Sequence, residues 1–395
     1  MKLFLDNCSN YYKFVYQLIC LFCLSVLVTN KLLSLTFLEI SLLNHFARTL
    51  CYIFAFINLC LFLKEKNYKI SLIFMLFAVI GLLCKKSSSS SELLQFSLLV
   101  FAFSRLKFEK ALQVFICTIA VLMITVITSS LLELLDKTNY TFRNGEIRNA
   151  FGFTHPNVLG CVLFFLIMSS WAYVKDSFTN NIKIIILLLL TSFFIKYAID
   201  SRTSQYMCLF ASFLILISIL VSKKNFFSSN IVNSLYKIAF ILVFLLNFLL
   251  AYFYNSESSF FEYLNNSLSN RLYLYNNAIN NLSFTWFGQK LVLYDLDPFS
   301  LTSASSAKYQ VIDSFYLAFL YNKGLFSIVV YGICYYLLIK KSIEIQNPKI
   351  VVVMFCFAIY GITEQYFYLI CTNIFIYLVF AFQNKKNRVN PKNCI

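Results

Sequence analysis

The chain has 395 residues, of which 60% are hydrophobic and only 13% are charged. A soluble domain carries about 25% charged residues, so this composition leaves too little polar surface to cover a globule in water. The formal net charge of +16 would suit nucleic acid, but the basic residues lie between apolar runs, as membrane topology requires. The sequence therefore predicts an integral membrane protein and no nucleic-acid partner.

The thirteen cysteines raise the question of disulfides or a metal site. Most lie singly inside apolar runs, where cysteine behaves as a small hydrophobic side chain. No CxxC motif faces a second one at zinc spacing, and only Cys20 and Cys23 lie one helical turn apart. We expect no structural disulfide, no metal and no cofactor.

Apolar segments that are long enough to cross a bilayer recur along the chain. A spanning helix needs about 20 mainly apolar residues, which predicts an all-α protein of about twelve transmembrane helices in a single domain, residues 1–395. The fourth span contains Glu92 and Gln95, and only Glu364 and Gln365 divide the last two. The first helix is expected to stay as an uncleaved anchor. The expected spans are 12–29, 43–63, 69–85, 89–104, 111–132, 157–174, 183–199, 204–222, 235–254, 312–339, 349–366 and 367–384.

The basic residues orient these spans. Most of the 33 Lys and Arg residues fall in short connections on one side, which predicts that both termini are cytoplasmic in a multi-pass protein of the cytoplasmic membrane. Two connections on the other side are then conspicuous: a first outer loop at 134–156 and a large outer loop at 255–311, rich in Ser, Asn and Tyr. A loop as long as the second is uncommon as a mere connection.

Polar residues cluster where the sixth span begins. Arg148 precedes a glycine turn, and His155 and Asn157 flank Pro156, which suits the first turn of a helix. The N-terminus of that helix would face outward, where its dipole favours a bound anion. The alternative is a helix cap with one histidine at the membrane interface.

The second cluster is the short connection between the seventh and eighth spans, where Ser201, Arg202 and Thr203 follow Asp200. Arginine offers a planar fork of donors that matches phosphate, and the hydroxyls add further donors. An Asp–Arg pair that closes a tight turn is the alternative.

Two more clusters lie further along the chain. Arg271 is the only basic residue between Lys237 and Lys290, and the aromatic residues near it suit either sugar rings or the membrane interface. Asp313 begins the tenth span, where a carboxylate favours the helix dipole with or without a further role. Glu364 is a weaker candidate of the same type.

In this order, the clusters resemble the Wzy-type polysaccharide repeat-unit polymerases of the O-antigen ligase and polymerase superfamily, in their Gram-positive capsule or exopolysaccharide form. The resemblance covers about residues 110–385, and the asparagine that the family places after its aspartate is missing after Asp313. The matching residues are Arg148, Gly152-Phe153-Thr154-His155-Pro156-Asn157, Gly160, Ser201-Arg202-Thr203, Arg271, Gly288, Asp313-Ser314-Phe315-Tyr316-Leu317 and Gly324.

The resemblance implies an enzyme that polymerises undecaprenyl-pyrophosphate-linked oligosaccharide repeat units at the outer face by glycosyl transfer. The implied partners are that lipid-linked oligosaccharide, membrane lipid, a flippase and a chain-length regulator. Because a glycosyl pyrophosphate carries its own leaving group, arginines can stabilise the departing phosphates in place of a metal.

These considerations select the candidate site. We expect Arg202 and Arg271 to act on the leaving group and His155 to be the base, with Asp313 and Glu364 as alternatives. The expected substrate-binding residues are Arg148, Asn157, Ser201, Thr203, Asp313 and Glu364. The competing functions are a flippase for lipid-linked oligosaccharide, although no internal repeat is visible, and a ligase that moves polysaccharide to another acceptor.

Overall fold

The computed structural model describes residues 2–37, 42–135, 141–143, 146–221, 226–290 and 312–383. Within these ranges the chain is helical apart from one two-stranded hairpin, and nine helices are long and apolar enough to cross a membrane. The prediction of a helical, multi-pass membrane protein is thereby confirmed. The long helices are α1 (Lys2–Leu33), α2 (Leu42–Lys64), α3 (Tyr68–Ser88), α5 (Phe108–Leu131), α6 (Pro156–Tyr173), α7 (Phe178–Phe194) with η2 (Ile195–Ile199), α8 (Arg202–Leu220), α10 (Asn230–Tyr252) and α14 (Leu325–Glu344).

Other expected spans take shorter forms. The fourth is α4 (Glu92–Ala102) followed by η1 (Phe103–Arg105), and the eleventh is α15 (Pro348–Tyr360), which ends before Glu364. The twelfth comprises η3 (Gln365–Tyr368), α16 (Ile374–Tyr377) and α17 (Val379–Gln383). The tenth is broken at Gly324 into α13 (Phe315–Lys323) and α14. The count of twelve crossings stays a prediction.

The outward faces of the long helices carry large apolar side chains. Phe56, Leu72, Ile124 and Phe193 are each at least half exposed. A soluble protein does not show such continuous apolar surface, whereas hydrocarbon accommodates it. By contrast, α6 has apolar side chains on all sides, and most of them are buried against neighbouring helices.

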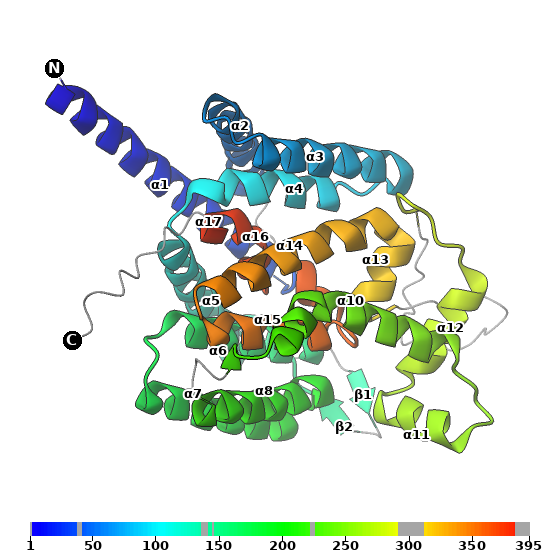
Figure 1. Cartoon of the computed structure of the whole chain (residues 1–395). Coiled ribbons are helices and arrows are strands. Elements are labelled where there is room, and N and C mark those ends of the chain that lie inside the picture. Colours follow the sequence, from blue (N-terminus) through cyan, green and yellow to red (C-terminus); the bar gives the residue numbers. More distant parts are fainter. Residues whose placement is uncertain are drawn as a thin grey trace.

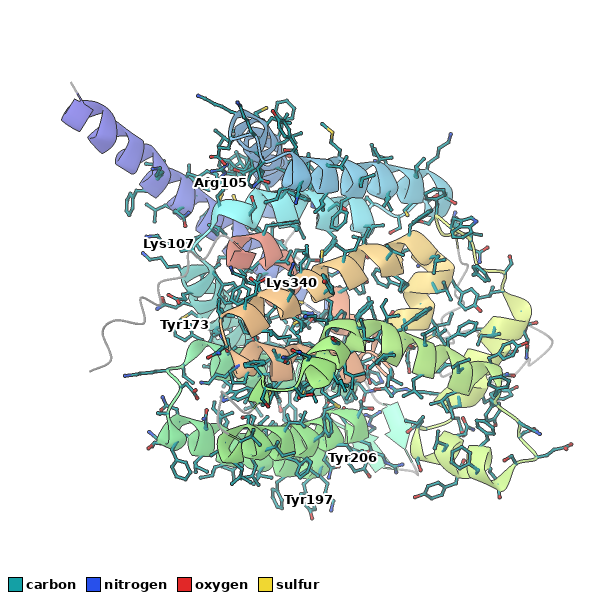
Figure 2. All side chains as sticks on the ribbon, in the orientation of Figure 1. Arg105, Lys107, Tyr173, Tyr197, Tyr206 and Lys340 are labelled. Atoms are coloured by element: carbon teal, nitrogen blue, oxygen red, sulfur yellow. The ribbon has the colours of Figure 1, made fainter. Side chains whose placement is uncertain are left out.

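Figure 1 shows most of the long helices running across the view. The strands β1 (Thr141–Arg143) and β2 (Glu146–Arg148) lie at the right, together with α11 (Ser259–Ser267) and α12 (Arg271–Asn281). We call this the hairpin end. Figure 2 labels Arg105 and Lys107 in the left-hand part of the molecule, away from Tyr206. Arg105 pairs there with Glu65 at 2.9 Å.

Candidate functional site

The breaks between helices place polar side chains together at the hairpin end. β2 leads to α6, whose N-cap is His155; its Nδ1 accepts a hydrogen bond from the backbone N–H of Asn157 at 3.1 Å. The π turn η2 ends at Asp200, which adopts a left-handed conformation with φ of 53° before α8 begins. Helix α12 begins at Arg271. Each of these residues belongs to a polar cluster that the sequence indicates: His155, Asn157, Asp200 and Arg271.

Arg271 is the most constrained of the arginines. It is only 7% exposed. Its Nε donates to Oδ2 of Asp313 at 3.0 Å, its Nη1 to Oγ1 of Thr203 at 3.0 Å, and its Nη2 to Oε1 of Glu364 at 2.9 Å. Each terminal nitrogen of a guanidinium carries a pair of N–H groups, so Nη1 and Nη2 each keep a further donor. Arg271 is therefore held in one orientation with donors to spare.

Helix α12 positions this guanidinium through its own packing. Leu272, Tyr275 and Ala278 are fully buried against α10 and α13. The hydroxyl of Tyr275 also donates to the carbonyl of Ile362 at 3.0 Å, which ties α12 to the segment that carries Glu364. The apolar face of the helix thus fixes the place at which Arg271 meets the carboxylates.

Glu364 lies between α15 and η3, outside the nine candidate spans of the described chain, and is 3% exposed. Its Oε1 accepts from Arg271 and also from Nδ2 of Asn157 at 3.1 Å. Burial raises the pKa of Glu364 to about 7, and the positive charge of Arg271 acts in the opposite direction. A carboxyl group with this pKa exchanges its proton near neutrality, as acid–base chemistry requires.

Arg148 makes a second constrained centre beside the first. Its Nη2 donates to the carbonyl of Asp200 at 2.6 Å and to Oδ1 of Asn157 at 2.9 Å. Because arginine can only donate, this contact fixes the amide of Asn157 with its oxygen toward Arg148 and its nitrogen toward Glu364. Asn157 therefore connects Arg148 to Glu364, and through it to Arg271.

Arg202 is less constrained than Arg148 and Arg271. Its side chain is exposed and makes no hydrogen bond or ion pair with any residue that the structure describes. It lines a cavity of about 190 Å³ together with Thr203, Tyr206, Ser269 and Arg271. The fixed guanidinium of Arg271 and that of Arg202, which pairs with none of the described residues, thus line the same space.

The structure brings most of the predicted site residues together. Direct contacts join Arg148, Asn157, Thr203, Arg271, Asp313 and Glu364, and Arg202 shares a cavity with Thr203 and Arg271. Ser201 is placed differently: it is 1% exposed, and its hydroxyl is 3.0 Å from that of Ser204 inside the bundle.

Sequence reasoning did not find Tyr206 or Ser269, which also line the cavity. Nothing in the sequence separates Tyr206 from the other tyrosines of this chain. Ser269 precedes Asn270 in a turn where both residues have positive φ, and a Ser-Asn pair before Arg271 is the signal that could have identified the turn.

In the part of the chain that the structure describes, no group of three or more His, Cys, Asp or Glu residues could hold a metal ion. Comparison with protein-family models, with curated proteins and with solved structures finds no match for this chain.

Proposed function

We propose that this membrane protein is a glycosyltransferase that polymerises undecaprenyl-pyrophosphate-linked oligosaccharide units, as the resemblance implies. The observation that carries the proposal is the shared cavity of Arg202 and Arg271. A departing pyrophosphate gains negative charge in the transition state, and preorganised cationic donors stabilise such charge strongly. Arg271 supplies the fixed donors, and Arg202 is free to bind the ligand.

The expected topology supports this use of the hairpin end. In the proposal the chain crosses the cytoplasmic membrane twelve times, both termini are cytoplasmic, and the hairpin end faces outward. The Arg105–Glu65 pair lies away from it, among the lysines expected on the cytoplasmic side. Within the large outer loop, residues 255–290 include α11 and α12, while 291–311 lie outside the described residues. The first outer loop, 134–156, includes the β-hairpin.

The reaction balances with the residues at hand. The bond between the anomeric carbon of the growing chain and its pyrophosphate oxygen breaks, and its electrons stay on the leaving oxygen beside Arg202 and Arg271. A hydroxyl oxygen of the next unit forms the new glycosidic bond. Its proton passes to Glu364, and the lipid pyrophosphate departs. No oxidant, reductant or nucleotide takes part, because the pyrophosphate linkage supplies the driving force.

Glu364 suits the role of base better than His155, which the sequence favoured. A neutral imidazole has one acceptor nitrogen, and Nδ1 of His155 already accepts from the N–H of Asn157 at the start of α6. Glu364 has a carboxylate oxygen, Oε2, that accepts no hydrogen bond from the described residues. Asn157 and Arg148 are then positioning residues that act through Glu364.

The test is a reaction with purified protein in liposomes and lipid-pyrophosphate-linked repeat units, without added nucleotide. We expect a ladder of longer lipid-linked glycans, which persists with a chelator present and disappears in Arg202→Ala. The exposed pair Lys85→Ala/Lys86→Ala, on α3 and outside the cavity, is the matched control and should leave the ladder unchanged. A flippase would move labelled units across the bilayer without changing their length. That result, with an authentic substrate, would overturn the proposal, as would transfer only to an unrelated acceptor.

A further inference from the structure

A second cavity lies apart from the site described so far. It has a volume of about 340 Å³ and is formed by α1, α2, the start of α4 and residues 368–370. Its lining shares no residue with that of the cavity around Arg202 and Arg271. Its lining combines polar and charged side chains with aromatic and aliphatic ones.

Two basic side chains of the cavity have no charged partner among the described residues. Lys31 and Arg48 both line it, and neither makes an ion pair or hydrogen bond with a residue that the structure describes. The acidic residue in the lining, Glu92, is already paired with Nζ of Lys323 at 2.9 Å, and Lys323 also contacts Ser90. The two basic side chains are therefore left to attract an anion, and an arginine beside a lysine suits a phosphate group.

Uncharged polar side chains line the same cavity: Asn30, Ser34 and Gln95. The Nδ2 of Asn30 donates to the carbonyl of Val26 at 2.8 Å, whereas Ser34 is exposed and Gln95 is half-buried. Hydroxyl and amide groups both donate and accept hydrogen bonds, as recognition of sugar hydroxyls requires. Tyr368, which is half-buried, provides aromatic surface of the kind that packs against sugar rings.

The chain connects this cavity directly to the first site. Glu364 belongs to the network around Arg271, and Leu369, five positions later, lines the second cavity. An extended chain advances at most about 3.6 Å per residue, so the Cα atoms of these residues lie within about 18 Å. The N–H of Thr154 donates to the carbonyl of Leu35 at 2.9 Å, which joins the end of α1 to the segment that leads to Asn157. The second cavity is therefore lined by segments that adjoin those of the first site.

We propose that the cavity around Lys31 and Arg48 binds the pyrophosphate and adjoining sugar of a second lipid-linked saccharide, the acceptor of the transfer reaction. The assignment rests on the proposed function. Joining two lipid-linked units requires two pyrophosphates, and only the donor loses its own. The acceptor keeps its pyrophosphate at the far end of the repeat unit, away from the reacting hydroxyl, so a separate basic cavity a short distance from Glu364 is where that group would be held.

The first experiment measures acceptor preference. A donor whose terminal sugar is blocked is supplied with either a lipid-pyrophosphate-linked acceptor or an alkyl glycoside of the same saccharide, which lacks phosphate. We expect the ratio of kcat/KM for the charged over the neutral acceptor to fall at least about tenfold in Lys31→Ala/Arg48→Ala. Lys31→Arg/Arg48→Lys should retain much of the preference, because both charges remain. The ratio should stay at the wild-type value in Lys85→Ala/Lys86→Ala, which removes the same charge from exposed positions of α3.

The second experiment separates this inference from the proposed function. Binding of undecaprenyl pyrophosphate to the full-length protein in detergent should show two sites, of which Lys31→Ala/Arg48→Ala removes one and Arg202→Ala the other. If Lys31→Ala/Arg48→Ala removes one binding site but the wild-type protein forms no ladder, the pyrophosphate site in the second cavity is supported and the polymerase function is overturned. An unchanged acceptor ratio and unchanged stoichiometry in Lys31→Ala/Arg48→Ala would overturn the inference alone. Equal displacement by phosphatidylglycerol would identify the cavity as a lipid headgroup site and overturn the acceptor assignment.

Discussion

Arg271 and Glu364 lie 93 residues apart in the sequence, yet Nη2 of Arg271 donates to Oε1 of Glu364 at 2.9 Å, with both side chains buried. Removing two charges from water is expensive, and the attraction between them offsets this only when further hydrogen bonds satisfy both groups. Asp313 and Thr203 supply those bonds to Arg271, and Asn157 supplies one to Glu364. The pair is therefore part of a hydrogen-bond network that links α6, α8, α12 and the segment after α15.

The network predicts a large loss of stability when one member of the pair is removed. Arg271→Ala leaves Glu364 and Asp313 without their cation, so the free energy of unfolding should fall by about 3–5 kcal/mol. Glu364→Gln keeps a hydrogen-bond acceptor and should be milder. The loss of stability in the double variant should differ from the sum of the two single losses by more than about 1 kcal/mol, because the residues interact directly. Unfolding in detergent measures all three variants, and strictly additive effects would contradict the network.

The stability of the protein should depend much less on Arg202 than on Arg271. The guanidinium of Arg202 is exposed and makes no hydrogen bond or ion pair with the described residues, so Arg202→Ala should change the free energy of unfolding by less than about 0.5 kcal/mol. Polymer formation should nevertheless be lost. Arg202→Lys keeps the charge but not the planar fork, and we expect a strong loss there as well. If lysine restores normal polymer length, a point charge suffices and bidentate recognition of phosphate is the wrong explanation.

The orientation can be tested by labelling with an impermeant thiol reagent in intact cells. A cysteine at Ser267, on the exposed surface of α11, should react, whereas one at Asn347, between α14 and α15, should not. The exposed Cys60 and Cys117 are replaced first, with the other endogenous cysteines. Ser305 and Asn387 offer further sites on the expected outer and inner sides, although both lie outside the described residues. The reverse labelling pattern would place the arginine cluster on the cytoplasmic side.

Much of the candidate site could be predicted because charged residues stand out in an apolar chain. Arg148, Arg271 and Asp313 are recognisable in the sequence for this reason. Their partners are not, since contacts across 93 residues depend on how the helices pack. Glu364 illustrates the limit: the sequence offers it as a weaker candidate that divides two spans with Gln365, and only the fold shows that it contacts both Arg271 and Asn157.

The helix breaks were harder to predict than the helices. Residues 312–339 form one apolar run, yet α13 ends at Lys323 and α14 starts at Leu325. The break depends on Gly324, whose φ of 84° is open mainly to glycine, and on its close approach to Trp286 and Gly288. The expected span 349–366 is likewise shorter in the structure: α15 has 13 residues, and its neighbours enclose it, so its length need not match the thickness of the lipid.

The break between α13 and α14 at Gly324 predicts how a substitution there affects stability. A Cβ atom at Gly324 would lie 2.5 Å from the carbonyl oxygen of Trp286, and the backbone there cannot shift cheaply. Gly324→Ala should therefore lower the free energy of unfolding by more than about 2 kcal/mol, from strain and overlap together. Gly332→Ala is the matched control in α14, where the nearest atom is the Cδ1 of Ile241 at 3.2 Å and the added methyl favours the helix. Similar unfolding midpoints for the two variants would show that the break tolerates a side chain.

The pKa of Glu364 predicts opposite effects of pH on activity and stability. In the proposed reaction Glu364 is the base and must be ionised, so kcat should rise as the pH increases through about 7 and then level off. Burial raises this pKa above the ordinary value of 4.5, so between these values the folded protein binds more protons than the unfolded chain. The stability that Glu364 contributes is thus complete below pH 4.5 and is lost as the pH rises through about 7. Glu364→Gln should abolish transfer, which the pH profile of kcat would show. It should also remove the fall in unfolding free energy between pH 4.5 and about 7, which unfolding curves at several pH values would measure. Retained activity with the same pH profile in that variant would assign the base to another group.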